Sequence, residues 1–412
     1  MDSAKPSLDL LRALTDERVL RALMASRRLT RAELASQTGL SKPTVGESVR
    51  RLAVAGLVAD TGARTPGGRG RGRVGSYYAL AADIGVALVL SIAPSGVTAE
   101  CVDSYGDVIA RRELGLDRPT RPAQVVAAVE AAATQVCEAT SNPCRLAVVS
   151  AADPVDRGSG RLVHLPDAPF LIGELSPAEL LSPYVGGEVI VDNDVNWAAR
   201  AERAATAVGP DHLDDFAYLY LGEGLGCAIV SDGEVRRGHA GLAGEVAHLI
   251  TAGVSGQAVP FTEVFADLGL RHRGSTAIDA SALLGAPATT RHALGQAVSG
   301  VLAAIVALAD PELIVIGGTW GAQPAVLDAI AAQFQRHPRH VPLRAAALTA
   351  EPPLAGARGH AVGALRAAIV ALPQDQDHSS ERGRLPAAGN LHRRAVSRLA
   401  SPAARHAGWA GR

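Results

Sequence analysis

Long hydrophobic runs, cysteine and lysine are all scarce in this sequence. No stretch approaches the roughly 18 apolar residues that a membrane-spanning helix needs, and the first residues, MDSAKPSLDLLRAL, lack the basic and then apolar segments of a secretory signal. A globular chain in the cytoplasm is therefore expected. The cysteines Cys101, Cys137, Cys144 and Cys227 show no C-x-x-C spacing, which favours reduced core thiols over a disulfide framework or a metal site.

Length and charge indicate more than one domain. With 412 residues, 48% of them hydrophobic, the chain can bury several cores. The net charge of −1 conceals an asymmetry, because residues 1–78 carry 14 Lys and Arg against 7 Asp and Glu, whereas the remainder carries 26 against 34. A basic N-terminal module joined to an acidic body is typical of polyanion binding at one end.

Residues 1–60 predict short helices followed by a hairpin. Thr30 and Glu33 form a T-x-x-E capping box, Gly39 supplies a turn, and Ser41 caps a third helix that ends near Gly56. Apolar stripes give each of the two longer helices a buried side. These stripes comprise Val19, Leu20, Leu23 and Met24 on the first helix, and Val45, Val49, Leu52 and Val54 on the third.

This segment, with LTRAELASQTGLSKPTVGESVRRLAVAGLV as its core, resembles a winged helix-turn-helix domain. In such modules the third helix enters the major groove of DNA. A helical hairpin that binds protein is the alternative. The residues expected to contact DNA from this helix are Ser41, Lys42, Thr44, Glu47, Ser48 and Arg51.

Residues 61–78 predict a wing or an Arg-Gly-rich linker. Arg69, Arg71 and Arg73 are expected to reach phosphates or the minor groove. A disordered basic linker is the alternative. The last segment, residues 373–412, has few apolar residues and no sustained periodicity, so a disordered basic tail is expected, either adding non-specific DNA affinity or inert.

The central stretch carries three polar motifs in order. VIVDNDVNWAARAE, residues 189–202, places Asn193 and Asp194 where a buried strand meets an amphipathic helix, which is where α/β sheets present ligand sites. GEGLG, residues 222–226, then predicts a hairpin. GLAGEVAH, residues 241–248, sets Glu245 and His248 three residues apart, on one face if helical.

This ordered series resembles the ROK family of sugar kinases and repressors, over roughly residues 8–371. The resemblance implies an α/β chain with the two-lobed, actin-like ATPase (sugar kinase) fold, preceded by the winged helix-turn-helix domain. The N-terminal lobe is expected at residues 79–190. The C-terminal lobe, with the ligand-site motifs, is expected at residues 191–372.

The resemblance also implies a ligand set of Asn193, Asp194, Glu245, His248 and Glu263. Asn193 matches the family's sugar-contacting amide and Asp194 its catalytic base, although a carboxylate at this position can equally accept a hydrogen bond from a sugar hydroxyl. Glu245 and His248 match the family's E-x-G-H motif, and Glu263 aligns with a glutamate that follows the family's cysteines. The alternatives are that Asn193 and Asp194 only cap a helix and that His248 is a core histidine.

Departures from the kinase pattern argue against ATP and zinc. Residues 82–87, ADIGVA, resemble the first phosphate loop, D-x-G-G-T, but keep only Asp83 and Gly85, and Glu223 places an anion in the second loop. Residues 309–318 match the adenosine-side motif, which is also ordinary sheet architecture. Because the zinc-binding stretch of the family lacks cysteine here, neither a cofactor nor a metal is expected.

The sequence therefore predicts a transcriptional regulator of ROK type, a repressor whose body senses a sugar or sugar phosphate. It would read a palindromic operator as a homodimer or homotetramer. The alternative is an ATP-dependent, glucokinase-like sugar kinase with a fused DNA-binding domain. A third interpretation is a constitutive regulator whose body serves only for dimerisation.

Overall fold

The computed structural model of the chain describes residues 8–65, 75–117, 120–165, 170, 174–207 and 212–379. Met1–Pro373 form one compact unit, and Gln374–Arg412 form a second. The expected DNA contacts Arg69, Arg71 and Arg73 lie outside the described residues, as does the expected tail from residue 380 onward.

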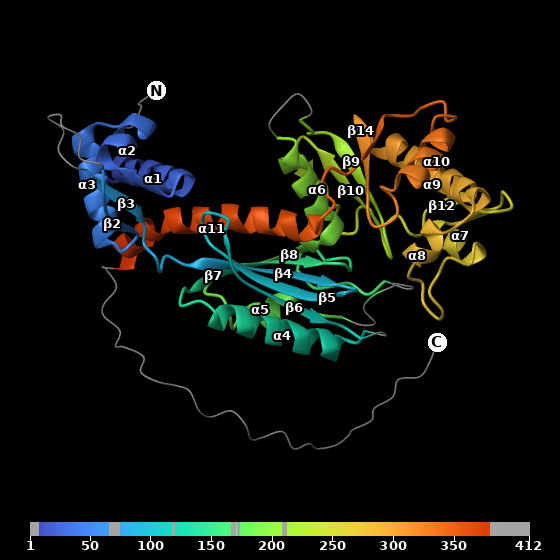
Figure 1. The fold of residues 1–412 in the computed structure, drawn as a ribbon, viewed down its shortest axis with the longest axis horizontal. Helices are drawn as coiled ribbons and strands as arrows, with labels where there is room; N and C mark the ends of the chain where they lie inside the picture. Colours follow the sequence, from blue (N-terminus) through green and yellow to red (C-terminus); the bar gives the residue numbers. More distant parts are fainter. Residues whose placement is uncertain are drawn as a thin grey trace, which may run out of the picture. The chain divides into compact units, whose positions relative to one another are not determined.

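The first domain contains three helices and a small antiparallel sheet (Figure 1, blue). The predicted capping box at Thr30 and Glu33 is confirmed, as are the left-handed Gly39 and the Ser41 cap, and each satisfies backbone groups that a helix end leaves unpaired. The elements are α1 (Leu8–Ser26), β1 (Arg28–Thr30), α2 (Arg31–Thr38), α3 (Lys42–Val54), β2 (Val58–Arg64) and β3 (Ser76–Leu80), with strand order β1-β3-β2.

The expected boundary between the first domain and the N-terminal lobe, at residue 79, falls inside β3, and residues 77–91 include parts of two strands in different domains. β3 pairs with β1 and β2 in the first domain, and β4 (Val86–Ala93) begins a new sheet. Gly85 separates them at φ +117°, a conformation that favours glycine, and a Cβ there would lie 2.6 Å from Cγ of Arg145.

The first lobe is a five-stranded sheet with a helix layer on each face (Figure 1). Alternate residues of β4 point to opposite faces: Val86 and Leu88 pack beneath α4, whereas Ala87 and Val89 join the buried cluster of α11. The elements are β5 (Gly96–Val102), β6 (Val108–Gly115), α4 (Pro122–Glu138), β7 (Cys144–Ala151), α5 (Pro177–Leu181) and β8 (Val189–Asn193), in the strand order β6-β5-β4-β7-β8. The expected lobe boundary at residues 190–191 thus falls inside β8.

The second lobe repeats this layered plan. Its sheet, β11-β10-β9-β14-β15, packs on α7, α9 and α10 through one face and on α6 through the other. The elements are α6 (Asp194–Ala205), β9 (Phe216–Leu221), β10 (Leu225–Ser231), β11 (Glu234–Val235), β12 (Ile250–Ala252), β13 (Ala258–Pro260), α7 (Phe261–Asp267), α8 (Ala280–Leu284), α9 (Ala288–Ala309), β14 (Leu313–Gly317), α10 (Pro324–Phe334) and β15 (Leu343–Ala345).

Helix α9 is the one described helix that is long and apolar enough to cross a membrane, contrary to the expectation from the sequence. Half of its most apolar window is buried inside the protein. Leu294, Val298 and Leu302 pack in the core of the second lobe, so the apolar character of α9 is that of a core helix.

Helix α11 (Pro352–Ser379) lies elsewhere than expected. The sequence analysis placed the residues up to 372 in the second lobe and expected a tail from residue 373. Instead α11 continues through Pro373, and its stripe of Leu354, Ala357, Ala361, Leu365 and Ile369 joins the buried cluster of the first lobe and the first domain. Helical spacing shows that such a stripe is buried but not which sheet covers it.

Candidate ligand site and DNA-binding surface

A cavity of about 340 Å³ is lined by residues of both lobes. Segments of both lobes reach it, among them the β4–β5 turn, the junction of β8 and α6, the β9–β10 hairpin, the stretch at residues 241–245 and the first turn of α11. The polar lining includes Ser91, Asn193, Asp194, Tyr220, Glu223 and Glu245.

Asn193 and Asp194 lie at the end of β8, as the sequence predicted. Asn193 is the N-cap of α6: its Oδ1 accepts the Val195 N–H at 2.9 Å, and its Nδ2 donates to the Asp153 carbonyl at 3.3 Å. Asp194 Oδ1 accepts the same N–H at 2.8 Å. Helix capping is therefore real here, and it fixes two polar side chains that also line the cavity.

The cavity is acidic. Burial raises the pKa of Asp194 to about 7, and burial together with the charge of Asp194 raises the pKa of Glu245 to about 7. Burial, with Asp194 and Glu223 nearby, raises the pKa of Tyr220 to about 12. Among the described residues that line the cavity there is no Arg, Lys or His. Such a lining accepts hydrogen bonds from hydroxyl groups and opposes anions.

His248 and Glu263 do not line the cavity, so the five predicted ligand residues are not brought together. His248 is exposed, and Glu263 on α7 pairs with Arg271 at 3.2 Å. The stretch around Glu245 is not helical, because Gly241 and Gly244 are left-handed at φ +93° and +97°. Three-residue spacing therefore does not put Glu245 and His248 on one face.

Residues 82–87, which the sequence analysis compared with the family's first phosphate loop, do not occupy that position in the structure. Val86 and Ala87 are fully buried in β4, and residues 82–87 do not line the cavity. The β4–β5 turn lines it instead, through Ala93, Pro94, Ser95 and Gly96. Pro94 has no N–H to offer a phosphate. The sequence signal for this turn is the Pro94-Ser95-Gly96 between two strand patterns.

The second predicted loop is confirmed as a hairpin between β9 and β10. The Gly222 N–H donates to the Gly224 carbonyl at 3.1 Å, and Trp320 Nε1 donates to the Gly222 carbonyl at 2.8 Å. Beside it, Gly318 is left-handed, and a Cβ there would lie 2.3 Å from the Leu221 carbonyl oxygen. Close backbone packing is thus a sufficient reason for the Gly-Gly turn after β14.

The first domain exposes the N-terminal half of α3. Ser41, Lys42, Thr44 and Glu47 are exposed as predicted. Arg50, which the sequence interpretation did not include, is exposed as well and pairs with Glu47 at 2.6 Å.

Ser48 was wrongly predicted to contact DNA, and Arg51 is only partly exposed. Ser48 is fully buried and donates to Asp16 at 2.5 Å, and Arg51 donates to the same carboxylate at 2.6 Å. Ser48 lies on the buried stripe with Val45 and Leu52, at i+3 and i+7, so it faces α1. Val54, expected to be buried, is off this stripe and 81% exposed.

A network of charged side chains joins the cavity to α11. Glu351, which lines the cavity, accepts hydrogen bonds from Arg111 at 2.7 and 3.0 Å. Arg111 also donates to the buried Glu100 at 2.7 Å, and Glu100 accepts two hydrogen bonds from Arg358 on α11, at 2.8 and 2.9 Å. A second contact ties the first domain to the β5–β6 turn, where Arg27 binds Asp107 at 2.6 and 2.8 Å.

Comparison with known proteins agrees with this architecture. A model of the ROK family matches residues 95–264, and a model of winged helix-turn-helix DNA-binding domains matches residues 12–59. N-acetylmannosamine kinase of Salmonella typhi is 26% identical over 298 residues, which is 66% of this chain and 96% of that protein.

Two solved structures share the fold. A ROK family transcriptional regulator, described as a homolog of the E. coli MLC protein, has a TM-score of 0.58 at 18% identity over 87% of this chain and 99% of that chain. A ROK family glucokinase from Streptomyces griseus, in complex with glucose and AMPPNP, has a TM-score of 0.51 at 22% identity over 67% of this chain and 99% of that chain.

Together these findings support a DNA-binding regulator, while the kinase relatives leave enzymatic activity undetermined. The chain thus carries a ROK family domain at residues 95–264 and an N-terminal winged helix-turn-helix domain, and it shares the sugar-kinase-type, actin-like fold of its solved neighbours.

Proposed function

We propose that this cytoplasmic protein is a sequence-specific transcriptional repressor of carbohydrate-metabolism genes, with a degenerate sugar-kinase body that senses a sugar. One observation carries the proposal: the same chain has an exposed recognition helix and an acidic cavity whose turns present Pro94 and Glu223. A missing N–H and an added anion both oppose a nucleotide phosphate. The DNA-binding domain would comprise residues 1–60 with its wing at 61–78, and the sensing body would follow.

The effector is proposed to be an uncharged polyhydroxylated molecule rather than a sugar phosphate. Asp194, Glu223 and Glu245 offer carboxyl oxygens to hydroxyl groups, and the described lining offers no cation to a phosphate. A like-charged pair about 4 Å apart costs on the order of 4 kcal/mol at an effective dielectric of 20. The absence of a counter-charge therefore favours a neutral sugar.

Helix α11 is proposed to carry the signal to the DNA-binding domain. Its first turn lines the cavity through Pro353 and Leu354, and its later residues Leu365 and Ile369 share one buried cluster with α1 and α3. An effector that binds one position of this first turn better than another would shift the population of DNA-binding states. Such an effect requires differential affinity for two states.

The first experiment is genome-wide immunoprecipitation of the tagged protein, followed by a gel shift at the best site. Lys42→Ala should weaken binding and lower the salt dependence of log K by about 0.9, because one phosphate contact is lost. Arg12→Ala, which removes an exposed cation on α1, is the matched control. Arg51→Ala would be a poor probe of DNA contacts, because Arg51 donates hydrogen bonds to Asp16 and its loss would also affect the stability of the domain. A discrete palindromic site lost in Lys42→Ala and kept in Arg12→Ala would support the regulator, and no enriched site would reject it.

The kinase alternative is favoured by one observation, the raised pKa of Asp194. A carboxyl group with a pKa of about 7 is suited to general-base catalysis at neutral pH. Saturable sugar-dependent ATP turnover that disappears in Asp194→Asn would establish this alternative. If instead neither turnover nor any change of DNA affinity follows a broad panel of neutral sugars, the body serves only as a constitutive dimerisation module.

A further inference from the structure

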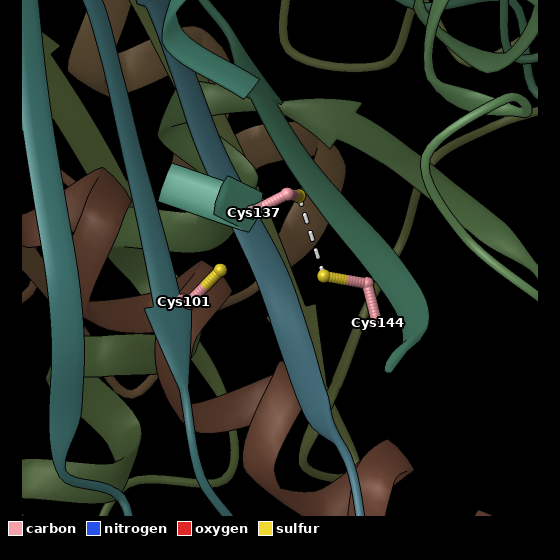
Figure 2. A group of neighbouring side chains, drawn as sticks. All are labelled: Cys101, Cys137 and Cys144. Atoms are coloured by element: carbon pink, nitrogen blue, oxygen red, sulfur yellow. Dashed lines mark hydrogen bonds between the residues drawn. The ribbon is translucent and has the colours of Figure 1, made fainter. Parts of the chain in front are cut away.

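Three of the four cysteines meet inside the first lobe, away from the ligand cavity. Cys101 lies on β5, Cys137 near the end of α4 and Cys144 at the start of β7, and their sulfur atoms all lie within 4.8 Å of one another. Figure 2 shows the three side chains converging, with the dashed line joining Cys137 and Cys144, whose sulfur atoms are 3.3 Å apart. The four cysteines are free thiols, as the sequence predicted, and three of them form one cluster, the three-cysteine cluster.

The sheet explains the convergence. β5 and β7 flank β4, where Cys101 is the register partner of Leu88 and Cys144 that of Val86. Leu88 and Val86 are two residues apart and therefore point to the same face, the one that α4 covers. Cys137 descends from α4 onto that face. Because the cluster depends on strand pairing, no short sequence motif predicts it.

The three-cysteine cluster lies in an apolar core, and all of its potential ligand atoms are sulfurs. Within the described part of the chain, the cluster contains sulfur ligands alone, with neither imidazole nor carboxylate. Cys101 is fully buried, Cys144 is 8% exposed, and Cys137 is partly exposed and provides a route of entry. Hydrogen bonds with Cys137 and Cys144, and then burial, raise the pKa of Cys101. The hydrogen bond with Cys101 lowers the pKa of Cys137, but the hydrogen bond with Cys144 and burial raise it more, and hydrogen bonds with both neighbouring thiols lower the pKa of Cys144.

We propose that the three-cysteine cluster is a binding site for one trivalent thiophilic metalloid of the arsenite or antimonite class. Binding is a condensation: As(OH)3 and three thiols give As(SR)3 and three molecules of water. Three As–O bonds break and three As–S bonds form, and each thiol proton leaves with a hydroxide as water. The oxidation states do not change, so no oxidant or reductant is required.

Charge selects the trivalent ion over other soft ions. Three thiolates around a trivalent centre are neutral, whereas a divalent ion leaves one negative charge and a monovalent ion leaves two. A net charge without a partner in an apolar core is strongly unfavourable. Structural zinc also takes about four ligands, and the cluster offers three. A Cys137–Cys144 disulfide would use only two of the sulfurs and would need an oxidant.

The test uses the purified full-length protein, reduced with a phosphine and titrated with inorganic arsenite. Bound arsenic per chain, the loss of titratable thiols and X-ray absorption at the arsenic edge are measured. Cys137→Ser is the main variant because its side chain is partly exposed and the substitution is small. Cys227→Ser is the matched control, since Cys227 is a buried free thiol on β10 outside the cluster.

The wild type and Cys227→Ser should each bind one arsenic with three sulfur neighbours and lose three thiols. Cys137→Ser should bind more weakly by at least about 10- to 100-fold, the loss that even removal of a supporting residue causes at metal sites. Circular dichroism melting of each variant checks that it is folded. Arsenic with fewer than three sulfurs, equal affinity in Cys137→Ser, or loss of binding in Cys227→Ser would overturn the proposal.

Two further arms distinguish other occupants. Tighter binding of Zn²⁺ than of arsenite, with a fourth ligand that is not sulfur, would replace the metalloid site by a zinc site. Conversion of Cys137 and Cys144 to a disulfide by dilute peroxide, with no arsenite bound to the reduced protein, would make the cluster a redox pair. Either result rejects the proposal.

Discussion

Single residues in the cavity make the stability of the protein depend on pH. The pKa values of Asp194 and Glu245 are raised to about 7, against about 4 in an unfolded chain. The folded state therefore binds more protons than the unfolded state between about pH 4 and pH 7. Their stabilising contribution is complete below about pH 4 and is lost as the pH rises through about 7.

We expect Asp194→Asn to flatten this dependence, because an amide does not titrate. The measurement is the free energy of unfolding from urea titrations at a series of pH values. Glu234→Gln, on the exposed edge of β11, is the control and should leave the curve unchanged. The prediction fails if the free energy of unfolding of the wild type rises between pH 4 and pH 7 and this rise is absent in Asp194→Asn.

Asp16 is a buried residue that is expected to stabilise the first domain through its hydrogen bonds. It accepts hydrogen bonds from Ser48 and Arg51, and both Asp16 and Ser48 are buried. Asp16→Ala should lower the free energy of unfolding by about 1–3 kcal/mol, because the Ser48 hydroxyl is left buried without its partner. Thermal and urea unfolding of the full chain measure the loss. Asp9→Ala, which removes an exposed pair with Arg12, should change stability by less than about 1 kcal/mol.

At the scale of elements, the contact between α6 and α11 depends on one glycine. A Cβ at Gly356 would lie 1.9 Å from the Trp197 carbonyl oxygen, so the two helices touch backbone to backbone. A Cβ at Gly359 or Gly363, in the same helix, would meet nothing within 4 Å. Composition showed that small residues occur in this helix but not which one faces α6.

Gly356→Ala and Gly363→Ala should therefore change stability in opposite directions. The first forces the helices apart and should cost about 1–3 kcal/mol. The second adds a methyl group to an exposed helix position and should stabilise by about 0.5–1 kcal/mol. Urea unfolding compares them directly. Equal effects would mean that α6 and α11 are not in close contact.

The elements differ in how far sequence alone predicts them. The Thr30–Glu33 capping box and the Gly222–Gly224 hairpin depend on residues a few positions apart, and both are confirmed. The partner of α11 depends on tertiary packing that no local signal encodes. The cavity is intermediate between these cases. Asn193 and Asp194 follow from the end of a strand, whereas His248 was assigned from the family's E-x-G-H motif and lies outside the cavity lining.

At the scale of the whole molecule, the expected homodimer needs an apolar surface. The first half of α1 exposes Leu8, Leu11 and Leu14, at 72%, 47% and 48%, on one face of the helix. Clustered exposed leucines are typical of an association surface. We propose that this face contributes to the dimer.

Leu11→Gln/Leu14→Gln should raise the dissociation constant of the dimer by about tenfold or more, since each buried leucine contributes about 1.5–3 kcal/mol. Sedimentation over a concentration series gives the constant. Leu308→Gln, at a site 86% exposed on α9, is the control and should have no effect. An unchanged constant in the double variant would place the dimer interface elsewhere.

The buried cluster shared by α11 and the first domain has a consequence for synthesis on the ribosome. The winged helix is translated first, yet the cluster that contains Val19, Leu52 and Leu80 also contains Leu365 and Ile369 from the last described helix. Domains usually fold in the order in which they emerge. Here the nascent DNA-binding domain is expected to keep apolar surface uncovered until translation is nearly complete. Unfinished chains would then be recognised by chaperones and proteases before they compete for operators.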